Sequence, residues 1–150
     1  VDGVLTDGGI YTGPDGVALK KFNVKDGAGI QILRSIGVET IILSSESDKT
    51  NAKILESRAK KIGVKHCYYG ISNKKNFLLD FMDSNSIVSE QLAYIGDDIN
   101  DLEAMSLAAL KVCPNNAVSS IKDIVDITLE LKGGEGCFRE LVELIKLYSQ

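Results

Sequence analysis

The sequence predicts an α/β fold in which a parallel β-sheet is covered by helices on both faces, with one β-hairpin inserted after the first strand. Short apolar runs rich in Val and Ile alternate with stretches of helical spacing, a pattern typical of parallel sheets. The chain has 150 residues, 44% of them hydrophobic, which is enough to form one core. No linker or internal repeat divides it, so we expect a single domain over residues 1–150.

Six apolar runs predict the strands of the sheet. They cover residues 1–5, 38–43, 65–69, 92–95, 109–112 and 125–129. Val1 is not an initiator Met and lies inside the first run, so we expect the start of the first strand to lie upstream. The carboxyl ends of parallel strands meet at one edge of a sheet, where ligands bind in open α/β folds. Residues that follow these runs are therefore the first candidates for a functional site.

Helices are predicted between the strands. The helices over 26–36 and 48–62 each end at a glycine, Gly37 or Gly63, that suits a left-handed cap. Asn73 is a candidate N-cap for a third helix. Apolar stripes on the third and the last helix are expected to pack in the core; they consist of Phe77, Leu78, Phe81 and Met82, and of Phe138, Leu141, Val142, Ile145 and Tyr148.

Residues 9–22 break the alternation of strands and helices. Two short apolar stretches flank the turn-forming sequence Gly13-Pro14-Asp15-Gly16, which predicts a β-hairpin. A hairpin that has no room in a parallel sheet either covers a site or pairs with a second copy of itself.

Composition excludes several classes of function. With 17 Lys and Arg against 21 Asp and Glu and no basic tract, the chain is not expected to bind nucleic acid or a membrane. Its apolar runs fall short of the ~20 residues of a membrane helix. Cys67, Cys113 and Cys137 form no CxxC pair, so we expect a reducing, cytoplasmic compartment and neither a disulfide framework nor a zinc site. His66 lies in an apolar run and is expected to pack rather than to ligate a metal.

Two acidic clusters follow predicted strands. Residues 1–8, which include Asp2 and Gly3, place carboxylates and glycines where the first run ends, and this pattern also fits a plain turn. Asp97, Asp98 and Asp101 follow the fourth run directly. Three neighbouring carboxylates repel one another unless a cation compensates them, which favours a hard metal such as Mg²⁺. The alternative is a helix N-terminus, which also favours negative charge.

Hydroxyl and ammonium groups follow two other predicted strands. Ser44 and Ser45 come after the second run, and Lys74 comes shortly after the third. A hydroxyl, main-chain amides and an ammonium group at one sheet edge suit a phosphate ligand. Taken singly, Ser44 also suits a helix cap and Lys74 a solvated helix start. Their joint placement with the two acidic clusters is what predicts a phosphate site.

The order of an Asp-Gly pair, a Ser, a Lys and the sequence GDDxxD resembles the four motifs of the haloacid dehalogenase superfamily of phosphatases. Residues 1–8, 22–27, 94–98 and 133–140 together resemble its small capless members, which act on phosphorylated 3-deoxy-2-keto sugar acids. Those members include octulosonate 8-phosphate phosphatases, nonulosonate (acylneuraminate) 9-phosphate phosphatases and a related module of some CMP-sialate synthetases. The resemblance covers essentially the whole chain and implies a Rossmann-like sheet.

This resemblance implies a Mg²⁺-dependent phosphomonoesterase that works through an aspartyl-phosphate. With Asp2 as the catalytic acid and base, the nucleophilic Asp of the family would immediately precede Val1. Asp2, Asp97 and Asp98 would hold the metal, Asp2 through its main-chain carbonyl. Ser44 would donate to the phosphoryl oxygens and Lys74 would neutralise their charge.

The resemblance also implies a set of substrate contacts. They are Asn23, Val24, Lys25, Asp26, Gly27, Gln31, Ser45, Glu46, Arg58 and Arg139. Octulosonate phosphatases usually carry Gly-Arg where this chain has Ser45 and Glu46, and Glu46 would repel a carboxylate, which favours a nine-carbon acid. For Glu46 and Arg58 the alternative is a solvated helix face.

Capless relatives imply a cytoplasmic homotetramer that acts in the synthesis of lipopolysaccharide or sialic acid. Its hairpins would join at the centre, and the loop 132–136 would close a neighbouring site. One rival interpretation is a catalytically silent oligomerisation module associated with a CMP-sialate cytidylyltransferase. The other is a phospho-acceptor receiver domain, against which the hairpin and the late GDDxxD argue.

Overall fold

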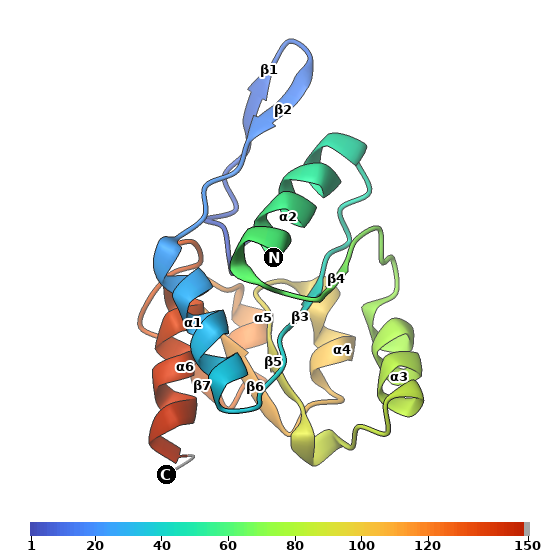
Figure 1. The fold of residues 1–150 in the computed structure, drawn as a ribbon, viewed down its shortest axis with the longest axis vertical. Coiled ribbons are helices and arrows are strands. Elements are labelled where there is room, and N and C mark those ends of the chain that lie inside the picture. The colour runs from blue at the N-terminus through green and yellow to red at the C-terminus, as the bar shows by residue number, and fades with distance from the viewer. Residues whose placement is uncertain (149–150) are drawn as a thin grey trace.

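The computed structural model describes residues 1–148, apart from the side chains of residues 17 and 18 (Figure 1). The strands are β1 (Tyr11–Gly13), β2 (Gly16–Leu19), β3 (Ile41–Leu43), β4 (His66–Tyr68), β5 (Ala93–Ile95), β6 (Leu110–Cys113) and β7 (Ile127–Thr128). The helices are α1 (Val24–Ser35), α2 (Lys49–Ile62), α3 (Lys74–Ser84), α4 (Leu102–Met105), α5 (Ser119–Lys122) and α6 (Cys137–Tyr148). Two short 3₁₀ turns cover Ser89–Gln91 and Ile99–Asp101.

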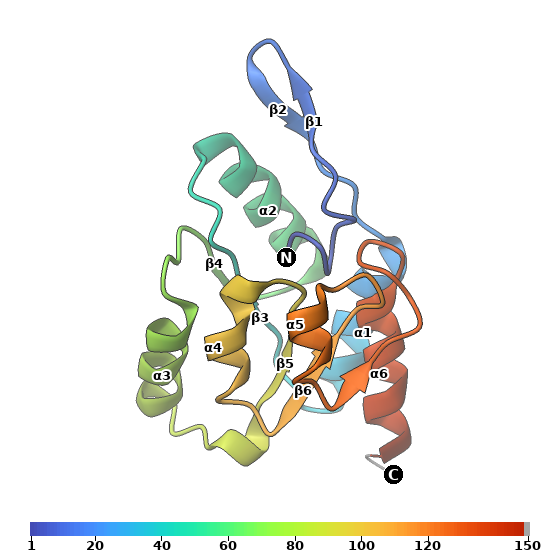
Figure 2. The same cartoon turned by 180° about the vertical axis from the view of Figure 1, so that it is seen from behind.

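The strands of the body are parallel, as predicted. β3 pairs with β4, and β5, β6 and β7 pair in that order. In the described part of the chain no strand pairing joins β3 to β5, so the predicted sheet consists of two parallel parts. Helices α1 and α6 lie together on one side of the strands, and α3 and α4 on the other (Figures 1 and 2). The α/β fold class is confirmed.

The strand predicted over residues 1–5 is wrong. The backbone turns there instead, and the carbonyl of Val1 accepts hydrogen bonds from the amides of Val4, Leu5 and Thr6. Gly3 adopts a φ of 76°, which an extended strand does not allow. A strand needs a partner to satisfy its backbone groups, and without one this segment satisfies them locally.

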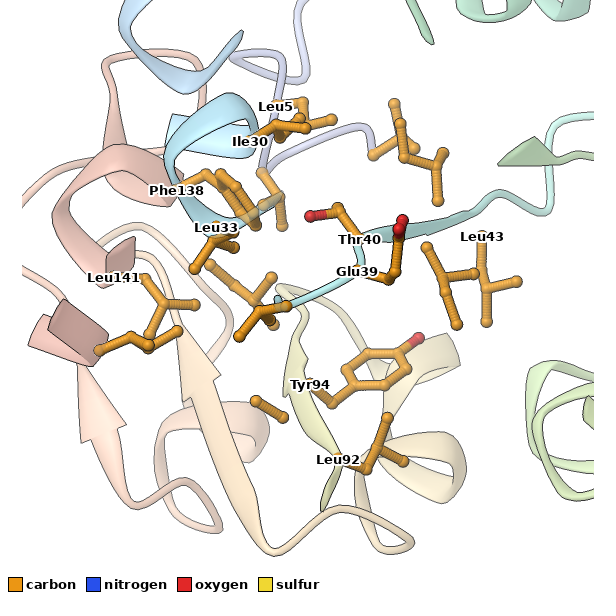
Figure 3. Close-up of a pocket in the computed structure, with 18 of the residues that line it drawn as sticks. Leu5, Ile30, Leu33, Glu39, Thr40, Leu43, Leu92, Tyr94, Phe138 and Leu141 are labelled. Atoms are coloured by element: carbon orange, nitrogen blue, oxygen red, sulfur yellow. The ribbon is translucent and has the colours of Figure 1, made fainter. Parts of the chain in front are cut away.

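An apolar cavity of about 210 Å³ lies between the two parts of the sheet, between β3 and β5. Figure 3 shows Leu5, Ile30, Leu33 and Phe138 around it, with Tyr94 from β5 on another side. Residues of β3 and of α6 complete the lining, together with Val1 and Val4. Leu5, Ile30, Leu33, Ile42 and Phe138 belong both to this lining and to the adjoining core cluster, so the cavity lies next to the main hydrophobic core.

The hairpin is confirmed. β1 and β2 are antiparallel, with Tyr11 opposite Leu19 and Gly13 opposite Gly16, and they project away from the body (Figure 1). Three large apolar side chains on it face solvent: Ile10 is 66% exposed, Tyr11 58% and Leu19 65%. The hairpin therefore offers an apolar surface that the described part of this chain does not cover.

The four long helices are confirmed, with shifted ends. Asn23 caps α1, Asp48 caps α2 and Asn73 caps α3, each through its side-chain oxygen. Gly63 ends α2 in the left-handed conformation, with a φ of 81°. The apolar stripe of α6 packs in the core as expected, except that Tyr148 is exposed. It lies in the last turn of α6, beyond the residues that meet the sheet.

His66 packs as its sequence context predicts. All three cysteines are free thiols in the structure. His66 packs against Phe81, with a ring separation of 5.6 Å, and hydrogen bonds to the hydroxyl of Tyr68. Within residues 1–148 no helix combines the length and hydrophobicity that crossing a bilayer requires.

Candidate active site

A polar hollow of about 390 Å³ lies where the carboxyl ends of β3 and β5 meet the turn at residues 2–8. Seven of the residues predicted to form the site line it: Asp2, Ser44, Ser45, Glu46, Lys74, Asp97 and Asp98. Asp7, Asn100 and Asn116 line it as well. Segments distant in the sequence thus meet at one sheet edge, as expected for parallel strands.

Ser44 extends the ladder of β3 by one residue, because its amide donates to the carbonyl of Tyr68 in β4 at 2.9 Å. Its hydroxyl oxygen accepts the amide of Glu46 at 3.2 Å, and the side chain is buried. The Glu46 carboxylate is held by the start of α2: it accepts the amide of Asp48 and the side-chain amide of Asn51, both at 2.9 Å. Glu46 is therefore a fixed carboxylate at the rim of the hollow.

Lys74 and Asp101 form a buried ion pair on the other side of the hollow. The ammonium of Lys74 donates to Oδ1 of Asp101 at 2.7 Å, and the hydroxyl of Tyr94 donates to the same oxygen at 2.8 Å. Burial opposes ionisation of Asp101, but the adjacent Lys74 ammonium outweighs it and holds the pKa below its usual range. Burial raises the pKa of Tyr94, which therefore stays a protonated donor. Asp101 thus positions Lys74.

Asp97 carries charge that its protein neighbours do not balance. Burial, reinforced by the charges of Asp101 and Asp98, raises the pKa of Asp97 to about 6. Its carboxylate also lies against the backbone of Gly3, where an added Cβ would come within 1.8 Å of Oδ2. The turn that carries Asp2 is therefore packed directly onto Asp97.

Asp2 is bound from the hairpin side by a residue that the sequence analysis missed. The Lys20 ammonium donates to both carboxylate oxygens of Asp2, at 2.8 and 2.7 Å, and the hydroxyl of Thr6 donates to Oδ1 at 3.2 Å. The sequence signal for Lys20 was its place at the end of the hairpin, just before the segment 22–27.

The hollow suits a hard divalent cation. Within residues 1–148 no three His, Cys, Asp or Glu side chains cluster closely enough to hold a metal by themselves. Mg²⁺ needs only one or two carboxylates, with water and phosphate oxygens completing its shell. Asp97 and Asp98 offer two carboxylates with excess negative charge, and both line the hollow with Asp2. The donor set therefore fits the predicted Mg²⁺, with room for other ligands.

The structure does not bring the predicted contacts of α1 into the hollow. Asn23 caps its helix, and Val24 is 79% exposed. Asp26 is buried against α6, where its Oδ1 accepts the amide of Arg139 at 2.9 Å and where burial raises its pKa. Lys25 and Gln31 face solvent, and Gly27 packs against Ile62.

Arg58 and Arg139 also lie outside the hollow. The Arg58 guanidinium stacks over the ring of Phe22 and donates to the carbonyl of Asn23 at 2.9 Å. Arg139 pairs with Glu143, one turn further along α6. The substrate role of this group stays a prediction.

The glycine-rich loop after β7 packs onto its own chain, and its reach to a neighbouring site stays a prediction. The amide of Gly134 donates to the carbonyl of Val4 at 2.9 Å. A Cβ on Gly133 would lie 1.9 Å from the carbonyl oxygen of Gly3, and one on Gly134 would lie 2.3 Å from the amide of Asp7. Only glycines permit this approach, so the loop supports the turn that carries Asp2.

Comparisons with known proteins agree on one family. A family model described as haloacid dehalogenase-like hydrolase matches residues 38–141. The 3-deoxy-D-manno-octulosonate 8-phosphate phosphatase of Escherichia coli is 37% identical over 98% of this chain and 76% of its own length. The Haemophilus influenzae enzyme is 36% identical over 97% of this chain and 78% of its own.

Solved structures give the same answer. The phosphatase of that name from Moraxella catarrhalis, in complex with magnesium, phosphate and KDO, superposes with a TM-score of 0.91 at 33% identity, covering 100% of this chain and 83% of its own. The cobalt-bound Haemophilus influenzae enzyme has a TM-score of 0.90 at 35% identity, covering 98% and 84%. The curated relatives named above, which match nearly the whole of this chain, are phosphatases, and the chain belongs to the haloacid dehalogenase-like hydrolases.

Proposed function

We propose that this protein is a Mg²⁺-dependent phosphatase that hydrolyses a phosphorylated 3-deoxy-2-keto sugar acid, with 3-deoxy-D-manno-octulosonate 8-phosphate as the first candidate. The observation that carries the proposal is the meeting of Asp2, Ser44, Lys74 and Asp97 in one polar hollow. The curated relatives, whose names state this substrate, support it.

The phosphate end of the substrate would lie between Ser44 and Lys74. The Ser44 hydroxyl donates to a phosphoryl oxygen, and the Lys74 ammonium offsets the charge of the transferring group. Asp97 and Asp98, with the main-chain carbonyl of Asp2, would hold Mg²⁺. The ion, when bound, shields phosphate charge from an attacking carboxylate.

Asp2 would be the acid and base of two successive steps. In the first, a carboxylate attacks phosphorus, the bond to the sugar oxygen breaks and Asp2 gives that oxygen its proton. In the second, Asp2 takes a proton from water, whose oxygen attacks phosphorus and releases phosphate and the free carboxylate. We place the attacking Asp immediately before Val1.

That placement requires a strand upstream of Val1, and the cavity between β3 and β5 suits it. Val1 lines this cavity, whose other walls are mostly apolar side chains of β3, β5, α1 and α6 (Figure 3). Within the described residues, β3 pairs only with β4 and β5 only with β6, so the two facing edges have backbone groups for one more strand. Residues 1–150 would then be a single domain whose first strand starts upstream.

A nonulosonate 9-phosphate is the second candidate substrate, and Glu46 is the observation that favours it. Its carboxylate is fixed at the rim of the hollow by Asp48 and Asn51. It would repel the carboxylate of a sugar acid at that point and accept hydrogen bonds from hydroxyl or amide groups instead. Longer acids offer more such donors.

The test is phosphate release by the protein expressed with its native upstream residues, with Mg²⁺ and three substrates: octulosonate 8-phosphate, a nonulosonate 9-phosphate and a hexose 6-phosphate. The proposal expects multiple turnovers on one keto-deoxy acid, and a loss of about 100-fold or more in Asp2→Asn. Asp15→Asn, in the exposed hairpin turn, is the matched control. No release by a folded protein would favour the silent oligomerisation module.

A further inference from the structure

Lys20 is a buried cation that the proposed chemistry has not yet used. It follows β2 directly, and its side chain is only 7% exposed. Its Nζ lies 2.8 and 2.7 Å from the two carboxylate oxygens of Asp2 and 3.8 Å from Oε2 of Glu46. Burying a long charged side chain is costly unless carboxylates pair with it, so its position is set by these two acids.

The hairpin stem holds Lys20 at this place. Phe22 forms an antiparallel bridge with Thr6, and the ammonium of Lys21 lies 3.4 Å from Oδ2 of Asp7. The stem thus runs beside the turn at residues 2–8 and contacts it at three successive residues. Thr6, almost fully buried, also donates to Asp2.

We propose that Lys20 is a positioning residue, which holds the Asp2 carboxylate by both oxygens and fixes its place relative to the phosphate site. This inference rests on the proposed role of Asp2 as acid and base. Asp2 lies on a turn with 45% of its side chain exposed, so without Lys20 the 3.2 Å bond from Thr6 would be its only side-chain hydrogen bond within the described residues. Misplacing a reacting group by about 1 Å can cost about 100-fold in rate.

The same contact gives the hairpin a second role. Lys20 connects the base of the hairpin to Asp2, so the orientation of the stem sets the orientation of the acid and base. Oε2 of Glu46, which also lines the hollow, lies 3.8 Å from the same ammonium. Lys20 is therefore held by two carboxylates of the site.

The test compares Lys20→Met and Lys20→Arg with the matched control Lys21→Met, in the protein with its native upstream residues and Mg²⁺. We expect Lys20→Met to lower kcat on the sugar-acid phosphate by about 10- to 100-fold, with KM changed less than about threefold. Lys20→Arg keeps the charge and should recover part of the loss. Lys21→Met, whose side chain is 55% exposed, should stay within about threefold.

A second substrate separates positioning of an acid from general damage. This substrate is p-nitrophenyl phosphate, whose leaving group, p-nitrophenolate, needs no proton from an acid. The rate at which p-nitrophenolate is released in the first turnover should therefore be nearly the same in Lys20→Met and in the unsubstituted protein. Equal losses on both substrates, or an unchanged kcat on the sugar acid, would overturn the proposal. If the unsubstituted protein releases no phosphate, the proposed function fails and the role of Lys20 falls with it.

Discussion

Lys74 and Asp101 form an ion pair of 2.7 Å in which both side chains are almost fully buried. Asp101 also accepts the Tyr94 hydroxyl and, at 3.1 Å, the amide of Asp97. One carboxylate therefore ties together α3, β5 and the loop that carries the proposed metal ligands. The distance between the Lys74 ammonium, the proposed phosphate-binding group, and Asp97 is set by this pair.

Breaking the pair from one side should destabilise the fold. Lys74→Met leaves the charge of Asp101 buried without its partner, which is expected to lower the free energy of unfolding by about 3–5 kcal/mol. Urea unfolding followed by circular dichroism measures it. The double variant Lys74→Met, Asp101→Asn removes both charges and should regain most of the stability but no phosphatase activity. A double variant with restored turnover would contradict the role of Lys74.

Asp97 should make the metal-free protein less stable as the pH rises. Its pKa is about 6 in the fold and 3.8 ordinarily, so the folded chain holds the proton more tightly. Below a pH of 3.8, Asp97 is protonated in both the folded and the unfolded chain and does not change the free energy of unfolding. Between 3.8 and about 6 the free energy of unfolding falls as the pH rises, and the loss is complete above about pH 6. In EDTA, Asp97→Asn should therefore be more stable than the unsubstituted protein by about 1 kcal/mol at about pH 7.5, and equal to it at about pH 3. A difference of the same size at both pH values would contradict this cause.

The glycine loop should tolerate no side chain at Gly133. A Cβ there would meet the backbone oxygen of Gly3 at 1.9 Å, so Gly133→Ala must displace one of the two loops. We expect a loss of about 1–3 kcal/mol in stability and at least about tenfold in kcat. Gly13→Ala is the control, because its Cβ would meet nothing nearer than 3.9 Å. Equal activity in the two variants would show that the loop does not support Asp2.

The hairpin should carry the contacts of the tetramer that the sequence predicts. Tyr11 and Leu19 face each other across β1 and β2 and are both largely exposed, so burying them between copies would stabilise assembly. The variant Tyr11→Lys, Leu19→Lys is expected to be a folded monomer, measured by light scattering and thermal melting. If the double variant and the unsubstituted protein have the same molecular mass in solution, the hairpin does not form the interface.

Local sequence signals predicted local structure. Asn73 caps α3 and Gly63 ends α2, because these residues act through hydrogen bonds and backbone angles within one turn. The strand expected over residues 1–5 was wrong because a strand depends on partners that the apolar pattern does not specify.

The site was predictable only as far as parallel topology determines it. Ser44, Lys74 and Asp97 each follow a strand, so alternating strands and helices were enough to bring them together. Lys20 and Gly133 contact the turn at residues 2–8 through the paths of a hairpin and a loop, which no local pattern specifies. The sequence also did not specify the direction of α1 relative to the hollow. The substrate contacts expected from α1 therefore lie outside the hollow in the structure.

The measurement that tests the account most directly is steady-state phosphate release from 3-deoxy-D-manno-octulosonate 8-phosphate by the protein with its native upstream residues, with Mg²⁺ and with EDTA. The account predicts many turnovers with Mg²⁺, almost none with EDTA, and a loss of about 100-fold or more in Asp97→Asn. Release that continues unchanged in EDTA, or an Asp97→Asn variant as active as the unsubstituted protein, would contradict it.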